Sequence, residues 1–343
     1  MNSACQVLYY FIMEPLDFVA VGDITTDAFI RIKDASVTCD INREHCMLCM
    51  RFGDKIPYES VEVVRAVGNG PNAAVSAARL GLRSAAVTNI GNDQNGAECL
   101  ESLRKDNVIT DFVTTEKGKP TNYHYVLWYE EERTILVKHT EFNYRFPESL
   151  PPPKWMYLTS LAPNSLPYHE QLVRFLSAHP EVKLAFQPGT FQIKLGIEKL
   201  KSLYERSEVF FCNRDEARLI LKKPTEEDME KLLAGIRGLG PKIAVITDGP
   251  KGAYTYDGSE YWHMPMYPDP KPPLQRTGAG DAFASTFVSA LALGKTIPEA
   301  LQWAPINSMS VVQQVGAQRG LLTRPALERF LAEAPSDYQP RIL

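Results

Sequence analysis

The sequence predicts an α/β fold, in which a mostly parallel central sheet carries helices on both faces. Short apolar segments of strand length alternate with longer segments of helical periodicity, and loops rich in Gly, Asn and Asp follow several of the apolar segments. The chain has 343 residues, of which 44% are hydrophobic and 23% charged, an ordinary composition for a large globular α/β protein. We expect a single domain over residues 15–335, preceded by an N-terminal extension, residues 1–14.

The elements of the central sheet can be placed in order along the chain. Short apolar runs predict strands at residues 17–22, 85–90, 155–161, 182–186, 208–212 and 243–247. Amphipathic or alanine-rich runs predict helices at residues 72–80, 95–105, 168–178, 194–202, 215–221, 226–235 and 282–293. Strands that alternate with helices pair in parallel, so this order predicts three layers, α/β/α.

Two segments, residues 29–67 and 119–141, break the alternation. The first has many β-forming residues and little helical periodicity. In the second, Tyr123, Tyr125 and Leu127 recur at every second position ahead of a charged stretch at residues 130–133, which predicts a hairpin. We expect the two segments to form a small antiparallel sheet that projects from the main domain. Such a sheet would serve as a lid or as the surface of a homodimer.

Charge and hydropathy exclude two classes of partner. The formal net charge is −4, which argues against a nucleic-acid binder held by general electrostatics. The longest apolar stretch near the start, residues 7–13, is too short to span a bilayer or to form the apolar part of a signal peptide. We therefore expect no membrane association and a cytoplasmic location.

Four potential metal ligands lie close together: Cys39, His45, Cys46 and Cys49. The spacing of Cys46 and Cys49 is typical of zinc ligands, so a small zinc site is one interpretation. The alternative is a strand in which the cysteines act as small hydrophobic residues.

The segment Thr277-Gly-Ala-Gly-Asp281 stands directly before the predicted helix at residues 282–293. The first N–H groups of a helix are unpaired and carry partial positive charge, and glycine lets a phosphate approach them closely. An aspartate beside a phosphate would repel it, so its presence there needs an explanation. One explanation is that the aspartate is the general base for an attacking hydroxyl. The alternative is that Asp281 only caps the helix.

Further loops of this kind occur at residues 22–27, 68–72, 213–216 and 247–252. Each one alone has an ordinary conformational explanation. Taken in order with residues 277–281, they resemble the ribokinase-like (PfkB) family of carbohydrate and nucleoside kinases over about residues 17–325. The resemblance rests on the 68–72 segment with its alanine-rich helix, on Asn213-x-x-Glu216, and on residues 277–283.

The resemblance implies an ATP-dependent kinase that phosphorylates a hydroxyl of a small sugar of the ribose, fructose or sugar-acid class. Asp281 would be the general base. The backbone N–H groups of the anion hole would come from Gly278, Ala279, Gly280 and Asp281. The acceptor would be held by Asp27, Gly68, Asn69, Gly70 and Asn72.

The resemblance also implies residues for ATP and Mg²⁺: Asn213, Glu216, Thr247, Gly249, Gly252, Arg276 and Asn307. Glu216 would organise Mg²⁺ largely through water, and Asn307 would lie near the adenine. Many relatives have an Asp two residues before Thr277, where it helps to build a monovalent-cation site. Gln275 stands there in this chain, so K⁺ activation is an open question, and Arg276 is a candidate for a fixed positive charge beside the phosphates.

Structural alternatives exist for several of these residues. Asp27 could cap a turn after the first strand. Asn213 and Glu216 could form a plain capping box at a helix start. Asn307 could be a buried polar group that bonds to backbone inside a helix.

Three other functions compete with a sugar kinase. A ribonucleoside kinase is one, since Tyr123, Tyr125, Trp128 and Tyr129 could stack on a base, although strand packing or a dimer seam explains them equally. A non-catalytic sugar- or nucleotide-binding regulator is another. A dinucleotide-binding fold would read Gly68-x-Gly70-x-x-Ala73 as its fingerprint, but Pro71 interrupts that turn and Asp281 would have no task.

Overall fold

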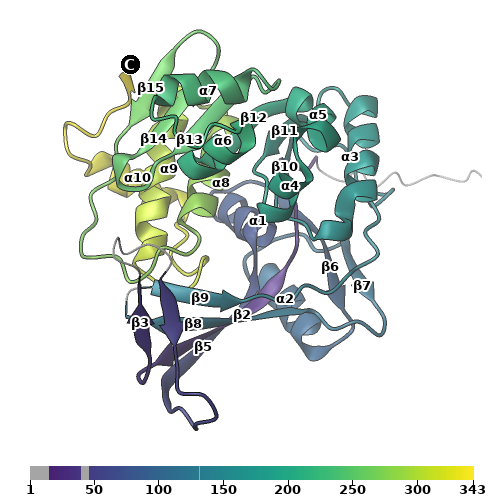
Figure 1. Ribbon diagram of the computed structural model, residues 1–343. Coiled ribbons are helices and arrows are strands. Elements are labelled where there is room, and N and C mark those ends of the chain that lie inside the picture. Colours follow the sequence, from purple (N-terminus) through teal and green to yellow (C-terminus); the bar gives the residue numbers. More distant parts are fainter. Residues whose placement is uncertain (1–14, 40–45, 131) are drawn as a thin grey trace, which may run out of the picture.

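The structure, a computed structural model, describes residues 15–39, 46–130 and 132–343 (Figure 1). One large sheet lies between two layers of helices, so the predicted three-layer α/β/α arrangement with a mostly parallel central sheet is confirmed. The expected extension, residues 1–14, lies outside the described residues. Within the described ranges, no helix is both long and apolar enough to cross a membrane.

The central sheet has ten strands in the order β16-β15-β14-β13-β12-β11-β10-β1-β6-β7. Every neighbouring pair from β13 to β7 is parallel, and β14, β15 and β16 add an antiparallel edge. All residues of β1, β6 and β10 are buried, as expected for strands that helices cover on both faces. The strands are Phe18–Val21 (β1), Ser84–Gly91 (β6), Val113–Glu116 (β7), Trp155–Leu158 (β10), Lys183–Phe186 (β11), Ser207–Asn213 (β12), Ile243–Thr247 (β13), Ala253–Tyr256 (β14), Tyr261–Met264 (β15) and Arg341–Ile342 (β16).

Each helical layer forms its own hydrophobic core against one face of the sheet. One core contains buried side chains of α1 (Asn69–Arg79), α2 (Gln94–Lys105), α8 (Ala279–Ala292), α9 (Ile297–Val312) and α10 (Arg324–Ala332). The opposite core contains side chains of α3 (Leu166–Ala178), α4 (Thr190–Leu195), α5 (Ile197–Arg206), α6 (Arg214–Leu221) and α7 (Met229–Arg237). Short 3₁₀ helices, Pro163–Ser165 and Gly249–Lys251, follow β10 and β13.

One predicted helix, residues 194–202, is wrong in its boundaries. The structure divides this segment into α4 and α5, with Gly196 between them at φ 85°. That left-handed conformation ends one helix and suits glycine, which has no Cβ. The segment nevertheless packs on the face of the sheet that a single helix would have covered.

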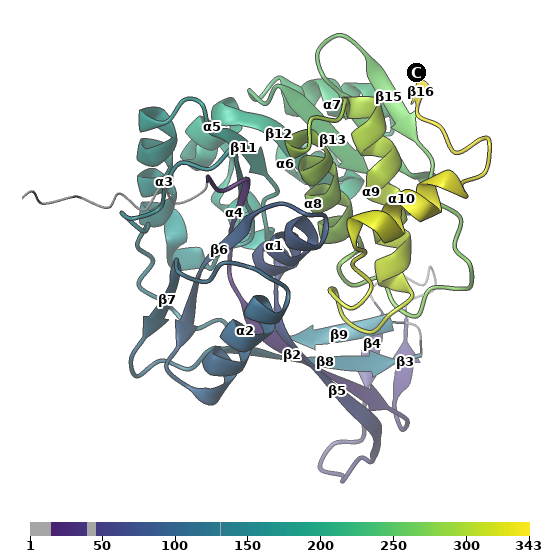
Figure 2. The same cartoon turned by 180° about the vertical axis from the view of Figure 1, so that it is seen from behind.

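A second sheet projects from the main body, in the order β5-β2-β8-β9 (Figure 2). Its strands are Thr25–Ile32 (β2), Tyr58–Val67 (β5), Asn122–Tyr129 (β8) and Glu132–Leu136 (β9). The predicted hairpin is present as the antiparallel pair β8–β9. The expectation of an entirely antiparallel sheet is wrong, because β2 and β8 pair in parallel. We call this four-stranded sheet the lid; it starts at Thr25, earlier than the predicted boundary at residue 29.

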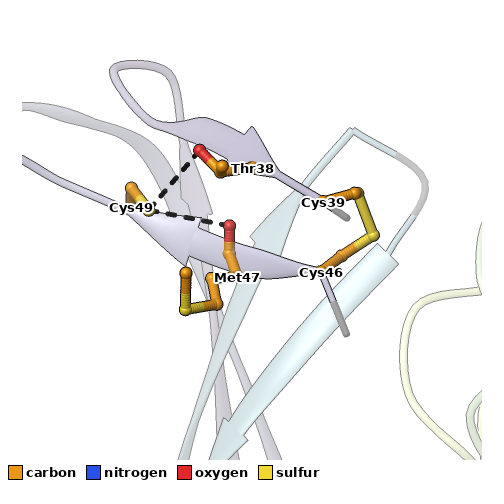
Figure 3. The surroundings of a disulfide bond; sticks show 5 residues. All are labelled: Thr38, Cys39, Cys46, Met47 and Cys49. Atoms are coloured by element: carbon orange, nitrogen blue, oxygen red, sulfur yellow. Dashed lines mark hydrogen bonds between the residues drawn. A yellow bond between two sulfur atoms is a disulfide. The ribbon is translucent and has the colours of Figure 1, made fainter. Parts of the chain in front are cut away.

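A small hairpin beside the lid contains the cysteines for which a zinc site was one interpretation. Strands β3 (Ser36–Thr38) and β4 (Met47–Cys49) pair antiparallel, and Cys39 and Cys46 at their ends form a disulfide (Figure 3). A disulfide removes both thiolates that a zinc ion would need, so the zinc interpretation is wrong for these two residues. His45 lies outside the described residues, and the described part of the chain contains no group of three or more His, Cys, Asp or Glu placed to hold a metal.

Candidate active site

The candidate site lies along the carboxyl ends of the parallel strands. Polar residues lie at the end of β13, β12, β11, β10 and β1 or within two positions after it, in this spatial order: Thr247, Asn213, Gln187, Thr159 and Asp23. Open α/β sheets bind ligands at this edge, because the connecting loops and helix N-termini converge there. The other groups of the site are placed by the turns that begin α1, α6 and α8.

The turn before α8 is shaped for close approach to its backbone. Gly278 is the N-cap residue, with φ 79°, and a Cβ at this position would lie 2.4 Å from the Cβ of Ala317. Only glycine therefore fits there. A Cβ added at Gly280 would meet no atom closer than 3.9 Å, so the space beside this residue is open. The first N–H groups of α8 thus border free space where an anion would be stabilised.

Asp281 lies on the first turn of α8, as predicted. Its Oδ2 accepts a hydrogen bond from Nδ2 of Asn72 over 2.9 Å, and Gln187 also bonds to the carboxylate. The pKa of Asp281 is raised to about 6: burial is the main cause and the charge of Glu216 adds to it, while the hydrogen bonds from Asn72 and Gln187 act in the opposite direction. The carboxylate is thus mostly ionised at neutral pH and holds a proton more readily than an exposed aspartate, which suits a general base.

Asn213 and Glu216 form the capping box that the structural alternative predicted. Asn213 Oδ1 accepts from the N–H of Glu216, and Glu216 Oε2 accepts from the N–H of Asn213, each over 2.8 Å. Burial raises the pKa of Glu216, although the backbone bond from Asn213 lowers it. The charge of Glu216 also raises the pKa of Asp281. Capping and ion binding are compatible here, because capping occupies one carboxylate oxygen.

A cavity of about 550 Å³ lies between the ends of β12 and β13 and the start of α8. Five of the seven residues predicted for ATP line it: Asn213, Thr247, Gly249, Gly252 and Arg276. Ala279 and Gly280 of the predicted anion hole also border it. Its other walls are largely apolar and come from residues that sequence reasoning missed, among them Met266, Tyr267, Phe283, Pro305 and Met309.

Asn307 does not line this cavity. Its side chain is fully buried, with Nδ2 donating to Thr286 Oγ1 over 2.8 Å and Oδ1 accepting from the N–H of Leu322 over 2.9 Å. The structure therefore favours the structural alternative for Asn307 over a place beside the adenine. The next residue, Ser308, faces the cavity instead, because adjacent residues of a helix point in different directions.

A second polar group surrounds Asp27 at the base of the lid. Asp27 Oδ1 lies 3.3 Å from Nδ1 of His124 on the neighbouring strand, and the rings of His124 and His139 are 5.4 Å apart. Asp23 accepts a hydrogen bond from the Tyr144 hydroxyl over 2.7 Å, and burial raises the pKa of Asp23 to about 6. We call Asp23, Asp27, His124, His139 and Tyr144 the acceptor cluster.

Several polar atoms of this region are buried without a hydrogen bond in the described chain: Asp23 Oδ2, His124 Nε2, His139 Nδ1 and Arg133 Nε, while Asp27 Oδ1 makes only its ion-pair contact with His124. Buried polar groups normally find partners, so such a concentration is typical of a site that a polar ligand completes. Only Asp27 was predicted from sequence. The other members come from distant segments, and their only signal was the presence of two of the six histidines near one hairpin.

The predicted glycines of residues 68–70 pack against the end of β1. A Cβ at Gly68, where φ is 119°, would lie 2.4 Å from the carbonyl oxygen of Asp23, and one at Gly70 would lie 3.0 Å from the Cα of Gly22. Asn69 is the first residue of α1, and Asn72 follows one turn later. These contacts place the start of α1, from which Asn72 donates to Asp281, beside the backbone of Gly22 and Asp23.

Comparisons with known proteins point to one family. The model of the pfkB family of carbohydrate kinases matches residues 35–324. The ribokinase of Bacillus subtilis is 26% identical over 275 residues, covering 77% of this chain and 87% of the relative. The 5-dehydro-2-deoxygluconokinase of the same organism is 26% identical over 292 residues, covering 80% and 89%.

Among solved structures, Arabidopsis thaliana ribokinase complexed with ribose and ATP superimposes with a TM-score of 0.73 at 20% identity, covering 93% of this chain and 99% of that chain. At this identity the likeness supports the fold, and the family match extends over most of the chain. The chain belongs to the pfkB family of carbohydrate kinases, which are phosphotransferases with an alcohol group as acceptor.

Proposed function

We propose that this kinase transfers the γ-phosphoryl group of ATP to a hydroxyl of a small sugar, with Asp281 as the general base. The observation that carries the proposal is the order of groups along one edge of the sheet. The cavity lies at β12 and β13, Gln187 and Asp281 meet beside β11, and the acceptor cluster follows β1. Donor site, base and acceptor site are thus arranged in the order in which the phosphoryl group would move.

The cavity has the chemistry of a nucleotide site. Its apolar part, with Tyr267, Phe283 and Met309, suits a nucleobase, and its polar part, with Arg276 and the start of α8, suits phosphates. The cavity volume of about 550 Å³ lies within the usual range for pockets that bind small molecules and cofactors. ATP would therefore lie with its base between α8 and α9 and its phosphates toward Gly280.

Glu216 and Asn213 fit a Mg²⁺ ion that accompanies the phosphates. Carboxylate and amide oxygens are suitable ligands, and Mg²⁺ usually keeps several of its water molecules. The charge of Glu216 also raises the pKa of Asp281, a repulsion that a nearby cation would relieve. When bound, the ion would neutralise charge on the β- and γ-phosphates.

Asp281 would take the proton of the acceptor hydroxyl. The hydroxyl oxygen of the acceptor would form a bond to the γ-phosphorus of ATP, while the bond from the γ-phosphorus to the β-phosphate oxygen breaks. Sugar hydroxyls are poor nucleophiles, so positioning and charge stabilisation provide most of the catalysis. The N–H groups of residues 278–281 would stabilise the charge on the transferred group. Asn72, bonded to Asp281, would orient the base and contact the acceptor.

The acceptor cluster supports a polyhydroxylated acceptor. Asp27 accepts hydrogen bonds from hydroxyls, and His124 and His139 can donate or accept. The ribonucleoside alternative loses part of its support, because side chains of adjacent strand residues point to opposite faces. His124 faces Asp27, so Tyr123 and Tyr125 face away from the cluster. We therefore favour ribose, fructose or a sugar acid as the acceptor class.

We also propose that the lid is the surface of a homodimer. Its outer face carries exposed apolar side chains on three strands, including Val61, Tyr125 and Leu136. A contiguous apolar strip on a soluble protein usually marks an interface. Sedimentation of the full chain would test this, and Tyr125→Glu should convert a dimer into a monomer.

The catalytic proposal is tested by ADP release with a panel of sugars, sugar acids and nucleosides, with Asp281→Asn as the matched control. We expect one sugar class to stimulate ADP release by the wild type and not by the variant. Thermal shift with a non-hydrolysable ATP analogue should show binding to both proteins. If the wild type binds the analogue and a sugar but releases no ADP, the result would instead support a non-catalytic sugar- or nucleotide-binding regulator.

A further inference from the structure

The buried side chain of Gln275 joins the start of the anion-hole turn to the loop after α9. Its Nε2 donates to the carbonyl oxygens of Gln314 and Gly316, over 2.9 and 3.3 Å. The residue is only 6% exposed. The backbone N–H of Leu274 also donates to the carbonyl of Val312, over 2.9 Å. A side-chain contact and a backbone contact therefore both join residues 274–275 to residues 312–316.

The chemistry of the neighbours assigns the orientation of the amide. A glutamine amide has two donor hydrogens on nitrogen and only acceptor capacity on oxygen. With Nε2 facing two carbonyls, both hydrogens have an acceptor. The reverse orientation would place three oxygen atoms against one another. The positive end of the amide dipole thus faces the carbonyl oxygens.

The same loop contacts the anion hole and the neighbour of the base. Ala317 lies against Gly278 so closely that no Cβ fits between them. Gln318 Nε2 donates to Asn72 Oδ1 over 3.0 Å, and Asn72 donates to Asp281. A displacement of this loop would therefore change both the turn that binds the phosphoryl group and the orientation of Asn72.

The residues around Gln275 do not fit the monovalent cation that the family resemblance implies. A cation needs oxygen ligands that converge on it, and the donor end of the Gln275 amide, Nε2, occupies the space between these two carbonyls; the buried Oε1, which has no hydrogen-bond partner in the described chain, is the other end of the amide. Residue 275 also provides no negative charge. We propose that the Gln275 amide takes the place of a monovalent cation, so that Gln275 is a positioning residue of the anion hole and catalysis does not need K⁺. The proposal rests on the proposed function only for its kinetic test.

The kinetic test measures ADP release in KCl, NaCl and choline chloride at equal ionic strength. Wild-type rates should agree within about twofold, because equal ionic strength screens charges equally. Gln275→Asp should lower kcat in choline by about tenfold or more, as expected when anion-hole donors are misplaced, and KCl should restore part of it. Gln275→Met should lose activity equally in all three salts. Strong activation of the wild type by K⁺ would overturn the proposal.

Gln313→Asp is the matched control. Gln313 is similarly buried and its Nε2 also donates to a backbone carbonyl, that of Lys271, but its side chain donates to neither the Gln314 nor the Gly316 carbonyl. Its variant should show the wild-type ratio of rates in K⁺ and choline. An equal gain of K⁺ dependence in Gln313→Asp would mean that any buried carboxylate creates it, and would refute the special role of Gln275.

A second readout needs no activity and separates this proposal from the proposed function. Melting temperatures are compared in KCl and choline chloride, without substrates. The wild type should melt at the same temperature in both, whereas K⁺ should raise the Tm of Gln275→Asp by about 2 °C or more through binding to the folded state. A K⁺-specific rise for the wild type would refute the proposal even if no sugar substrate were found.

Discussion

Asn72 donates a hydrogen bond from Nδ2 to Oδ2 of Asp281 over 2.9 Å, joining the first turns of α1 and α8 across 209 residues of sequence. The other end of the Asn72 amide is also held, because Oδ1 accepts from Gln318. The Asn72 amide therefore has one orientation, and its Nδ2 donor orients the Asp281 carboxylate. This contact connects the start of α1 to the carboxylate that we propose as the base.

Asp281→Asn should lower kcat by about 10²–10⁴-fold, because it removes the group that accepts the hydroxyl proton. The fold and the KM for ATP should change little, since asparagine has nearly the same shape. Steady-state kinetics with circular dichroism would check this. A fully active Asp281→Asn enzyme would exclude Asp281 as the base.

The pH dependence of kcat/KM should show an acidic limb near pH 6. The pKa of Asp281 is raised to about 6, and the base must be ionised, so the rate should fall as the pH drops through this value. Asp23 also titrates near 6, but it lies in the acceptor cluster. Asp23→Asn should therefore raise KM and keep the limb; disappearance of the limb in this variant would assign it to Asp23.

Asp281→Asn should also stabilise the protein at neutral pH. A carboxyl group whose pKa rises from 3.8 to about 6 on folding binds more protons in the folded state, so its ionisation destabilises the fold as pH rises through that range. The gain in the free energy of unfolding should be about 1–3 kcal/mol at pH 7 and vanish near pH 4. Urea denaturation at both pH values would measure it; an equal gain at both would contradict the assignment.

Asn72→Ala should move the acidic limb to higher pH. The hydrogen bond from Asn72 lowers the pKa of Asp281, so its loss should raise that pKa. Ser76→Ala is the control, because Ser76 lies on the same helix and its hydroxyl contacts Thr286 of α8 but not Asp281. A limb that moves equally in both variants would reflect general loosening of the helix contact.

Asn307→Ala should lower the free energy of unfolding by about 2–4 kcal/mol, since it removes the hydrogen bond to Thr286 Oγ1 and leaves the partly buried N–H of Leu322 without its acceptor. The KM for ATP should not change, because Asn307 lies outside the cavity. Ser308→Ala is the contrasting variant: Ser308 lines the cavity and should affect KM for ATP more than stability. An increased KM in Asn307→Ala at unchanged stability would restore its predicted place near the adenine.

Much of the fold could be predicted because its signals are local. Continuous apolar runs such as residues 18–21 mark strands buried on both faces, and glycine positions mark turns that no other residue tolerates. The split at Gly196 was missed because the hydrophobic pattern continues across it. Parallel pairing of β2 with β8 was missed because it joins segments far apart in the chain, which no local pattern specifies.

The sequence by itself determined the class of fold, the family resemblance and the position of Asp281 on the first turn of a helix, because those depend on spacing within short segments. Only the tertiary structure decided what surrounds these residues. It brought His124 to Asp27, placed Asn307 inside the protein, and turned the Gln275 amide toward two carbonyls. It also raised the pKa of Asp281, since burial and the charge of Glu216 come from segments that meet only in the folded chain.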